Sequence, residues 1–217
     1  MKKISLLAAL MVGMIVLPSV SDAAVLSSRN VWNTIKNEVT TRAKDKVVKQ
    51  SQGGTKKMQI SQFPQTLAEF KAMPQMDLRK PENTLLMFLC AANHWTIDKT
   101  AGEEAINLLS NPKRQMTPYD KQFLRDRLGD KHYLPRSYFE GATPANNYTP
   151  SEPLTLKVMP DGRPQDVEAG YKRLFVKTSG AEANRYIKLR EKDGVWYLWE
   201  YFGLLPSIAL PTAESDW

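Results

Sequence analysis

The stretch RYIKLREKDGVWYLWEYF, residues 185–202, decides the fold. Hydrophobic and polar residues alternate on both sides of Asp193-Gly194, and a period of two is typical of strands with one buried face. Asp-Gly between two such runs is a strong signal for a tight hairpin turn, because both residue types tolerate a positive φ. We therefore predict two antiparallel strands, at 185–192 and 195–202.

Two stretches upstream have the same period, LTLKVM at 154–159 and YKRLFVKT at 171–178. No helical pattern separates any of the four, which predicts an antiparallel four-stranded meander in the C-terminal half. The preceding part reads as helices: PENTLLMFLCAANHW, residues 81–95, is apolar nearly all round, so we expect a buried central helix. The predicted class is α+β, with an N-terminal helix cluster packed against the meander.

The N-terminal part has a different composition. Residues 1–23 combine two early lysines, an apolar run and small residues before Ala24, which is the pattern of a secretory signal peptide cleaved near Ala23. We expect an exported protein, periplasmic or secreted. Residues 24–50 form a basic amphipathic helical arm that could contact a membrane surface, 51–60 a linker, and 61–213 a single α+β domain.

The net charge and the cysteine count limit the partners and the covalent cross-links that the protein can have. The formal net charge is +7, which suits acidic envelope polymers, lipid headgroups or acidic proteins. No nucleic-acid-binding module has a signature here, so we expect no nucleic-acid partner. Cys90 is the single cysteine, so a disulfide within the chain is impossible.

The register of the last hairpin stays open between two alternatives. A two-residue turn places Leu189 opposite Leu198 and Ile187 opposite Glu200. The other face then carries an aromatic and cationic strip of Tyr197, Trp199, Tyr201, Lys188 and Arg190. Such a strip suits stacking on sugar rings and cation–π contacts. A three-residue loop with a glycine bulge shifts the register by one residue and turns the aromatic rings into the core.

The segment PRSYFEGATPANNYTPSEP, residues 135–153, is rich in proline and aromatic residues. It is either a connector pinned to the core or one wall of a binding groove that faces the last hairpin. On the second interpretation, the domain binds an envelope polymer, a glycan or a partner protein without catalysis. The ligand-binding residues are then Tyr138, Phe139, Asn147, Lys188, Trp199 and the acidic contact Glu200.

Two alternatives belong to other classes. An envelope-directed hydrolase would use Glu200 or the pair Asp126 and Asp130 as acid and base, and a structural protein would oligomerise through its sheet. No nucleophile elbow or phosphate-binding glycine loop occurs in the sequence, and Cys90 with His94 supplies only two potential metal ligands. We therefore expect no catalytic residues, no cofactor and no metal, and the oligomeric state stays open.

Three longer strings resemble a known family. The strings are KPENTLLMFLCA, LRDRLGDKHYLPRSYFEGATPANNYTPS and YIKLREKDGVWYLWEYFGLLPSI. They are similar to a family of exported bacterial proteins of unknown function, a likeness that covers residues 60–213 and implies one domain with no assigned activity. Helices followed by a meander also resemble nuclear-transport-factor-2-like domains, which hold small ligands or dimerise through the sheet. That second resemblance concerns fold alone.

Overall fold

The computed structural model describes residues 54–129 and 131–215. The predicted signal peptide and helical arm lie outside these residues, as does Asp130. The chain of the described part passes from one strand through a series of helices and then into a run of four strands.

The sheet has five antiparallel strands in the order in which they occur along the chain. The strands are β1 (Lys56–Ile60), β2 (Leu154–Pro160), β3 (Tyr171–Val176), β4 (Arg185–Lys192) and β5 (Val195–Glu200). The predicted four-stranded meander is therefore one strand short, because β1 lies within the stretch expected as a linker. Its five residues pair with β2 from Lys56 opposite Val158 to Ile60 opposite Leu154.

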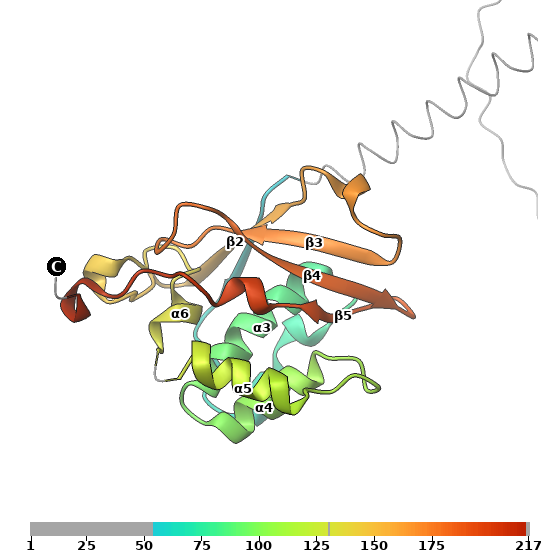
Figure 1. The fold of residues 1–217 in the computed structure, drawn as a ribbon, viewed down its shortest axis with the longest axis horizontal. Coiled ribbons are helices and arrows are strands. Elements are labelled where there is room, and N and C mark those ends of the chain that lie inside the picture. The colour runs from blue at the N-terminus through green and yellow to red at the C-terminus, as the bar shows by residue number, and fades with distance from the viewer. Residues whose placement is uncertain (1–53, 130, 216–217) are drawn as a thin grey trace, which may run out of the picture. The chain divides into compact units, whose positions relative to one another are not determined.

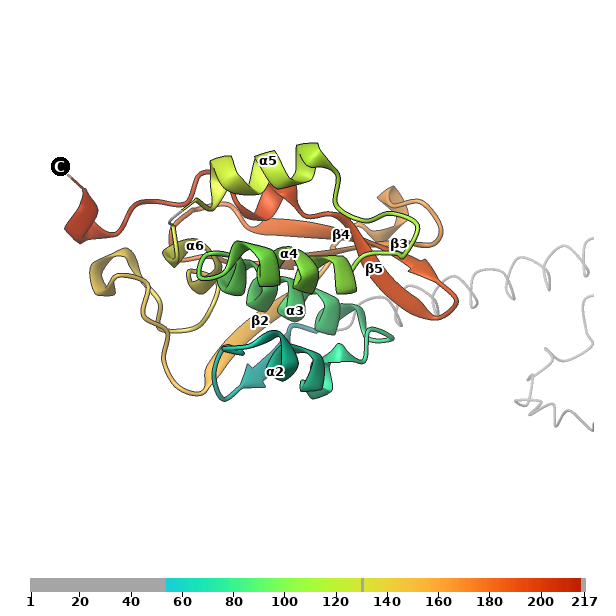
Figure 2. The same ribbon diagram turned by 90° about the horizontal axis from the view of Figure 1, so that it is seen from below.

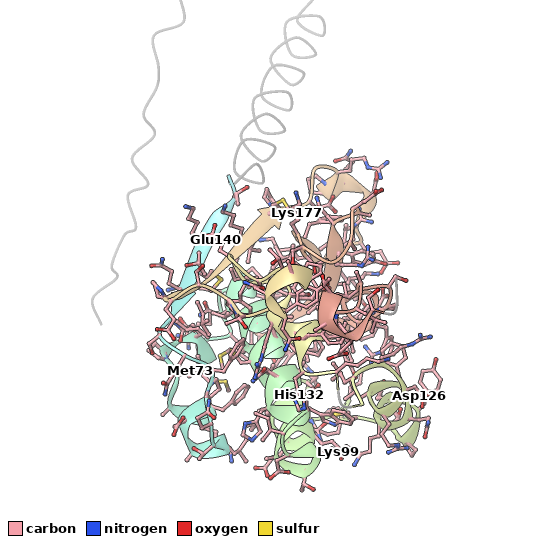
Figure 3. All side chains as sticks on the ribbon, turned by 90° about the vertical axis from the view of Figure 1, so that its left-hand side faces the viewer. Met73, Lys99, Asp126, His132, Glu140 and Lys177 are labelled. Carbon is pink, nitrogen blue, oxygen red and sulfur yellow. The ribbon has the colours of Figure 1, made fainter. Side chains whose placement is uncertain are left out.

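The helices cover one face of this sheet (Figures 1 and 2). They are α2 (Leu67–Ala72), α3 (Pro81–Trp95), α4 (Lys99–Leu108), α5 (Pro118–Arg127) and the short α6 (Tyr133–Arg136). In the end-on view, Glu140 and Lys177 mark the sheet side of the domain, and Lys99 and Asp126 mark the helix side (Figure 3). None of the helices in the described ranges is long and apolar enough to cross a membrane. The α+β class is confirmed.

Helix α3 forms the centre of the core, as its composition predicts. All of its 15 residues are buried. Its C-terminal end meets α4 closely, because Gly102 lies against the backbone of Trp95, and a Cβ atom there would come within 2.2 Å of the Trp95 Cα. Only glycine allows the two helices to approach so closely. This packing fixes where α4 and the loop that follows it lie relative to the sheet.

The last hairpin has the two-residue turn. Asp193 and Gly194 both have positive φ angles, of 54° and 79°, as this turn type requires. Leu189 lies opposite Leu198, so the first of the two predicted registers is confirmed next to the turn.

A β-bulge changes the register further along. Lys188 rather than Ile187 lies opposite Glu200, and Trp199 is the additional residue. The bulge moves the Glu200 carboxylate away from the apolar face on which the uninterrupted register would place it.

The edge of β5 that does not pair with β4 is hydrogen-bonded to the helix layer. The Trp196 amide donates a hydrogen bond to the Leu78 carbonyl at 2.9 Å, and the Leu198 amide donates to the Leu109 carbonyl at 3.0 Å. Leu109 directly follows α4, so the loop from Ser110 to Met116, which connects α4 to α5, begins beside β5. This arrangement positions the candidate site.

Candidate anion-binding site

The structure separates the six residues expected to bind a ligand. Tyr138 and Phe139 are buried in the core, with exposed fractions of 4% and 2%. The Tyr138 hydroxyl donates a hydrogen bond to the Leu204 carbonyl, and burial raises its pKa. Phe139 packs edge-on against Phe63, with the ring centroids 5.0 Å apart. Both rings are part of the core, which favours the connector interpretation of the 135–153 segment.

Asn147 also has a local role. It adopts the left-handed conformation, with φ 54° and ψ 37°, and ends the 3₁₀ turn Pro144–Asn146. Asparagine tolerates this conformation better than most residues. The three remaining residues, Lys188, Trp199 and Glu200, lie together on the hairpin, where Lys188 Nζ is 3.6 Å from Glu200 Oε1.

Trp199 is the centre of an aromatic and cationic cluster on the face of the sheet opposite the helices. The guanidinium carbon of Arg114 lies 3.7 Å from the centroid of the Trp199 ring, and that of Arg190 lies 4.9 Å from it. Tyr171 packs edge-on against the same ring at 5.2 Å. Tyr171 in turn has the Lys188 ammonium 4.8 Å from its centroid.

These contacts change what the cluster can bind. The Trp199 ring already has two guanidinium groups close to it, so it is not an open platform for a sugar ring. A guanidinium that stacks on an aromatic ring keeps the N–H donors at its edge, and those donors match a carboxylate or a phosphate. The cluster is therefore better suited to an acidic group than to a neutral sugar.

A hollow of about 370 Å³ lies beside the cluster, between the 110–116 loop and the hairpin. Its lining residues are Asn111, Lys113, Arg114, Arg190, Lys192, Tyr197, Leu198 and Trp199. The lining thus contains four cations and no carboxylate. Within the described part of the chain, none of these four forms an ion pair. Unneutralised cations around a concave surface produce a local positive potential that attracts anions.

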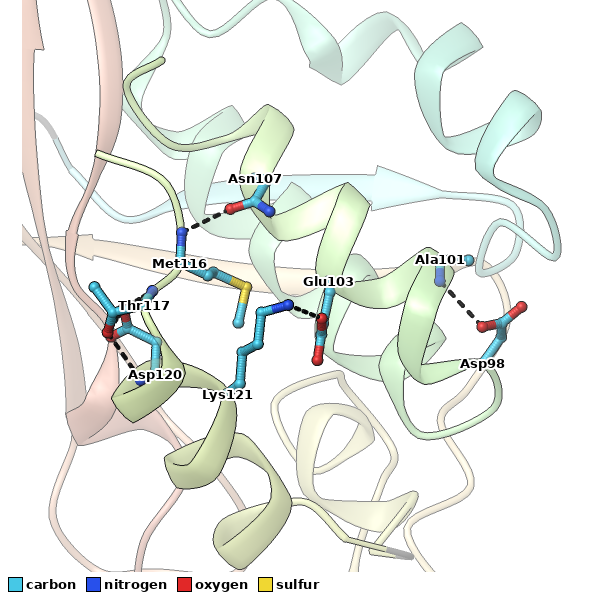
Figure 4. A network of polar contacts seen from close by, with 8 residues as sticks. All are labelled: Asp98, Ala101, Glu103, Asn107, Met116, Thr117, Asp120 and Lys121. Atoms are coloured by element: carbon cyan, nitrogen blue, oxygen red, sulfur yellow. Dashed lines mark hydrogen bonds and ion pairs between the residues drawn. The ribbon is translucent and has the colours of Figure 1, made fainter. Parts of the chain in front are cut away.

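The loop that carries Lys113 and Arg114 is fastened where it joins α5 (Figure 4). The Asn107 side-chain oxygen, on α4, accepts a hydrogen bond from the Met116 amide at 2.8 Å. Thr117 and Asp120 form a capping box at the start of α5. These bonds fix the end of the loop, two residues after Arg114, so the Arg114 guanidinium does not depend on a free segment for its position.

The ion pair between Lys121 and Glu103, at 2.6 Å, also joins α5 to α4. It lies between the two helices that flank the loop (Figure 4). The loop is therefore supported from both of its neighbouring helices, which is how a rigid scaffold positions functional residues on a connecting segment.

A second hollow of about 250 Å³ adjoins the first and shares Arg114, Leu198 and Trp199 with it. Tyr201 lines this second hollow and is 6% exposed, and its buried hydroxyl has no hydrogen-bond partner in the described structure. Burial raises the pKa of Tyr201, the nearby Asp120 carboxylate raises it further, and Arg114 lowers it.

Two carboxylates line a third hollow, of about 220 Å³, near the start of α3. Glu82 accepts a hydrogen bond from Lys56 Nζ at 2.7 Å, and Asp161 accepts one from Arg173 Nε at 2.7 Å. Each carboxylate has its own cation, which is the arrangement of structural ion pairs. The hollow therefore lacks a carboxylate free to act as an acid or base.

The other candidates for chemistry lie far from the hairpin or are buried. Asp126, on the helix side, accepts a hydrogen bond from Gln122 at 2.6 Å (Figure 3). Burial raises the pKa of the Cys90 thiol to about 12, so Cys90 is not an activated nucleophile. Residues 54–129 and 131–215 contain no group of three side chains able to hold a metal ion.

Sequence reasoning missed Lys113, Arg114 and Lys192. The first two lie in a short polar loop between helices, and no local pattern shows that this loop meets the last hairpin. Lys192 does have a visible signal, since it continues the alternation of Lys188 and Arg190 along one face of the strand.

The family of the chain follows from comparison with known proteins. No curated protein and no solved structure matches it. A family model described as a domain of unknown function, DUF6935, matches residues 62–212, which include α2 to α6 and the strands β2 to β5. The chain therefore belongs to the DUF6935 family.

Proposed function

We propose that this domain is a non-enzymatic binding module for an acidic ligand that carries carboxylate or phosphate groups. The hollow beside Trp199 is the binding site. The observation that carries the proposal is its lining of four cations without a carboxylate. Some cations of the domain have acidic partners, such as Lys121 with Glu103 and Arg173 with Asp161. The four cations of this lining form no ion pair within the described residues, so their charge is available to a ligand.

The geometry supports selective binding of an acidic group. Arg114 and Arg190 both lie against the Trp199 ring, so their side chains lose less freedom when an anion arrives. Arginine can hold a carboxylate or a phosphate through two parallel hydrogen bonds. Lys113 and Lys192 add charge at the edge of the hollow.

The cellular setting of the proposal comes from the sequence. Residues 1–23 have the pattern of a secretory signal peptide, which predicts an exported protein, periplasmic or secreted. Acidic polymers and acidic glycans of the envelope are then the ligands that combine the expected location with the charge of the hollow.

Isothermal titration calorimetry with polygalacturonate, a carboxylate polymer, tests the proposal. We expect saturable binding that weakens with added salt and no heat with dextran, a neutral polymer. The double variant Arg114→Gln/Arg190→Gln should bind at least about tenfold more weakly, because it removes two charge-assisted contacts.

The matched control is Arg127→Gln, an exposed arginine on α5 that lies outside the hollow. It changes net charge without touching the site, so it should bind as the unaltered protein does. Equal loss in the control and the double variant would contradict a specific site. Poly(glycerol phosphate) in place of polygalacturonate shows whether phosphate is preferred to carboxylate.

A further inference from the structure

Resting on the proposed function, we infer that the ligand is a linear polyanion that lies along the outer face of β4. The outer face is the face of the sheet opposite the helices. On this inference the hollow binds one end of the ligand, and the acidic groups that follow meet the successive cations of β4.

A row of cations on β4 provides the first reason. Lys188, Arg190 and Lys192 alternate with the buried Ile187 and Leu189, so the three cationic side chains share the outer face. Alternate residues of a strand are about 6–7 Å apart. The row therefore presents positive charges at regular intervals, beginning with Arg190 and Lys192 in the lining of the hollow.

Aromatic rings connect Arg114, Arg190 and Lys188. Trp199 contacts both Arg114 and Arg190, while Tyr171 contacts both Arg190 and Lys188. The register agrees, since Tyr171 lies directly opposite Arg190 on the neighbouring strand. A ligand that leaves the hollow would meet cations backed by aromatic rings on its way along β4.

The outer face is open to a partner. The helices cover the other face of the sheet (Figures 1 and 2). Arg190 and Lys192 are exposed, and Tyr186, which continues the row beyond Lys188, is 40% exposed. A polymer can lie on this face without displacement of any helix or strand within residues 54–129 and 131–215.

Charge complementarity favours a polymer over a single acid. One carboxylate or phosphate can be held by one or two cations, yet the hollow and β4 together present five. Like charges on one strand face repel each other until counterions or a polyanion neutralise them. A linear polyanion can neutralise them with successive acidic groups.

Glu200 gives the inference a second, opposite test. Its carboxylate lies 3.6 Å from Lys188 Nζ, and its side chain is 46% exposed. A polyanion that reaches Lys188 must compete with this carboxylate. Removal of the Lys188 charge should therefore weaken binding of long ligands, whereas removal of the Glu200 charge should strengthen it.

The experiment measures affinity for galacturonate oligomers of increasing length, from the monomer to chains long enough to span β4. In the unaltered protein we expect affinity to rise with length. Lys188→Gln should weaken binding of the long chains by about threefold, the effect of one exposed charge pair, and leave the monomer unaffected. Glu200→Gln should strengthen binding of the long chains by a similar factor.

Lys99→Gln is the matched control, because Lys99 lies in the helix layer, away from the sheet (Figure 3). It should leave the length dependence unchanged. Affinity that stays constant with length, or that is unchanged in both the Lys188 and Glu200 variants, would overturn the inference while the hollow still binds the monomer. Loss of all acidic ligands in the unaltered protein would instead overturn the proposed function.

Discussion

Helix α3 and strand β5 are both rich in large apolar residues, yet they serve opposite purposes. Every residue of α3 is buried, and its side chains contact other side chains of the core. In β5, Trp196, Tyr197 and Trp199 are only half-buried, and cations from neighbouring elements lie against the Trp196 and Trp199 rings. Apolar content alone therefore does not distinguish a buried element from a partly exposed one.

The difference in burial between α3 and β5 follows from how side chains are distributed around a helix and along a strand. A helix that is apolar all round has no face left for water, so it must lie between other layers. A strand exposes every second residue when only one face of its sheet is covered. The helices cover one face here, so the Trp199 ring on the other face takes Arg114 and Arg190 as neighbours, while Trp196 packs against the core.

The largest effect is expected when one aromatic side chain in each region is truncated to alanine. Phe88→Ala, in α3, should lower the free energy of unfolding by about 4 kcal/mol, since it leaves a cavity in a fully buried site. Trp199→Ala should cost only about 1–2 kcal/mol despite the larger ring, because water reaches its site already. Equilibrium denaturation in urea measures both, and equal losses would show that Trp199 is a core residue.

Alkaline pH tests the core in a second way, because a buried thiol makes the free energy of unfolding depend on pH. Burial raises the pKa of the Cys90 thiol from 9.0 to about 12, so the folded state keeps a proton that the unfolded chain loses. This contribution to stability is fully present below pH 9.0 and decreases as the pH rises toward 12, by about 1.4 kcal/mol per pH unit.

Denaturation series at several pH values across this range measure that slope. Tyr138 and Tyr201 add to it, because their pKa values are raised as well. A Cys90→Ala variant should lose the thiol's share of the slope, and an unchanged slope in that variant would assign the effect to the tyrosines.

The smallest expected effect lies where the two regions meet. Tyr201→Phe removes a buried hydroxyl without a partner and keeps the ring that packs 4.8 Å from Phe88, so it should stabilise the fold by about 1 kcal/mol. Tyr148→Phe removes a hydroxyl that donates to the Ala209 carbonyl at 2.8 Å, and it should destabilise the fold by a similar amount. Thermal unfolding of the two variants decides whether the signs differ.

Much of the fold could be predicted from local pattern. The central helix was expected at residues 81–95, and α3 has those bounds. The two-residue turn at Asp193-Gly194 is also present. Strand β1 was missed because it has only five residues and directly follows a glycine-containing stretch that reads as a linker. Its stability comes from pairing with β2, which lies far along the chain.

The candidate site was only partly predictable. Lys188, Trp199 and Glu200 share one hairpin, so strand alternation was enough to group them. Arg114 was not predictable, because its contact with Trp199 depends on how α4 packs on α3. Tyr138 was expected at a ligand, yet its aromatic ring fixes a long connection to the core, a role that has the same local composition.

The edge strand β5, which is hydrogen-bonded to the helix layer, affects whether the sheet of one molecule can pair with that of another. Exposed strand edges are templates for intermolecular pairing and aggregation. The Trp196 and Leu198 amides of β5 already donate to carbonyls of the helix layer, so this edge offers little to a strand from another molecule. The opposite edge, β1, carries Lys56, which is paired with Glu82, and Lys57, and lysines on an edge strand disfavour pairing with a second copy. Both edges of the sheet therefore disfavour its extension by a strand from another molecule.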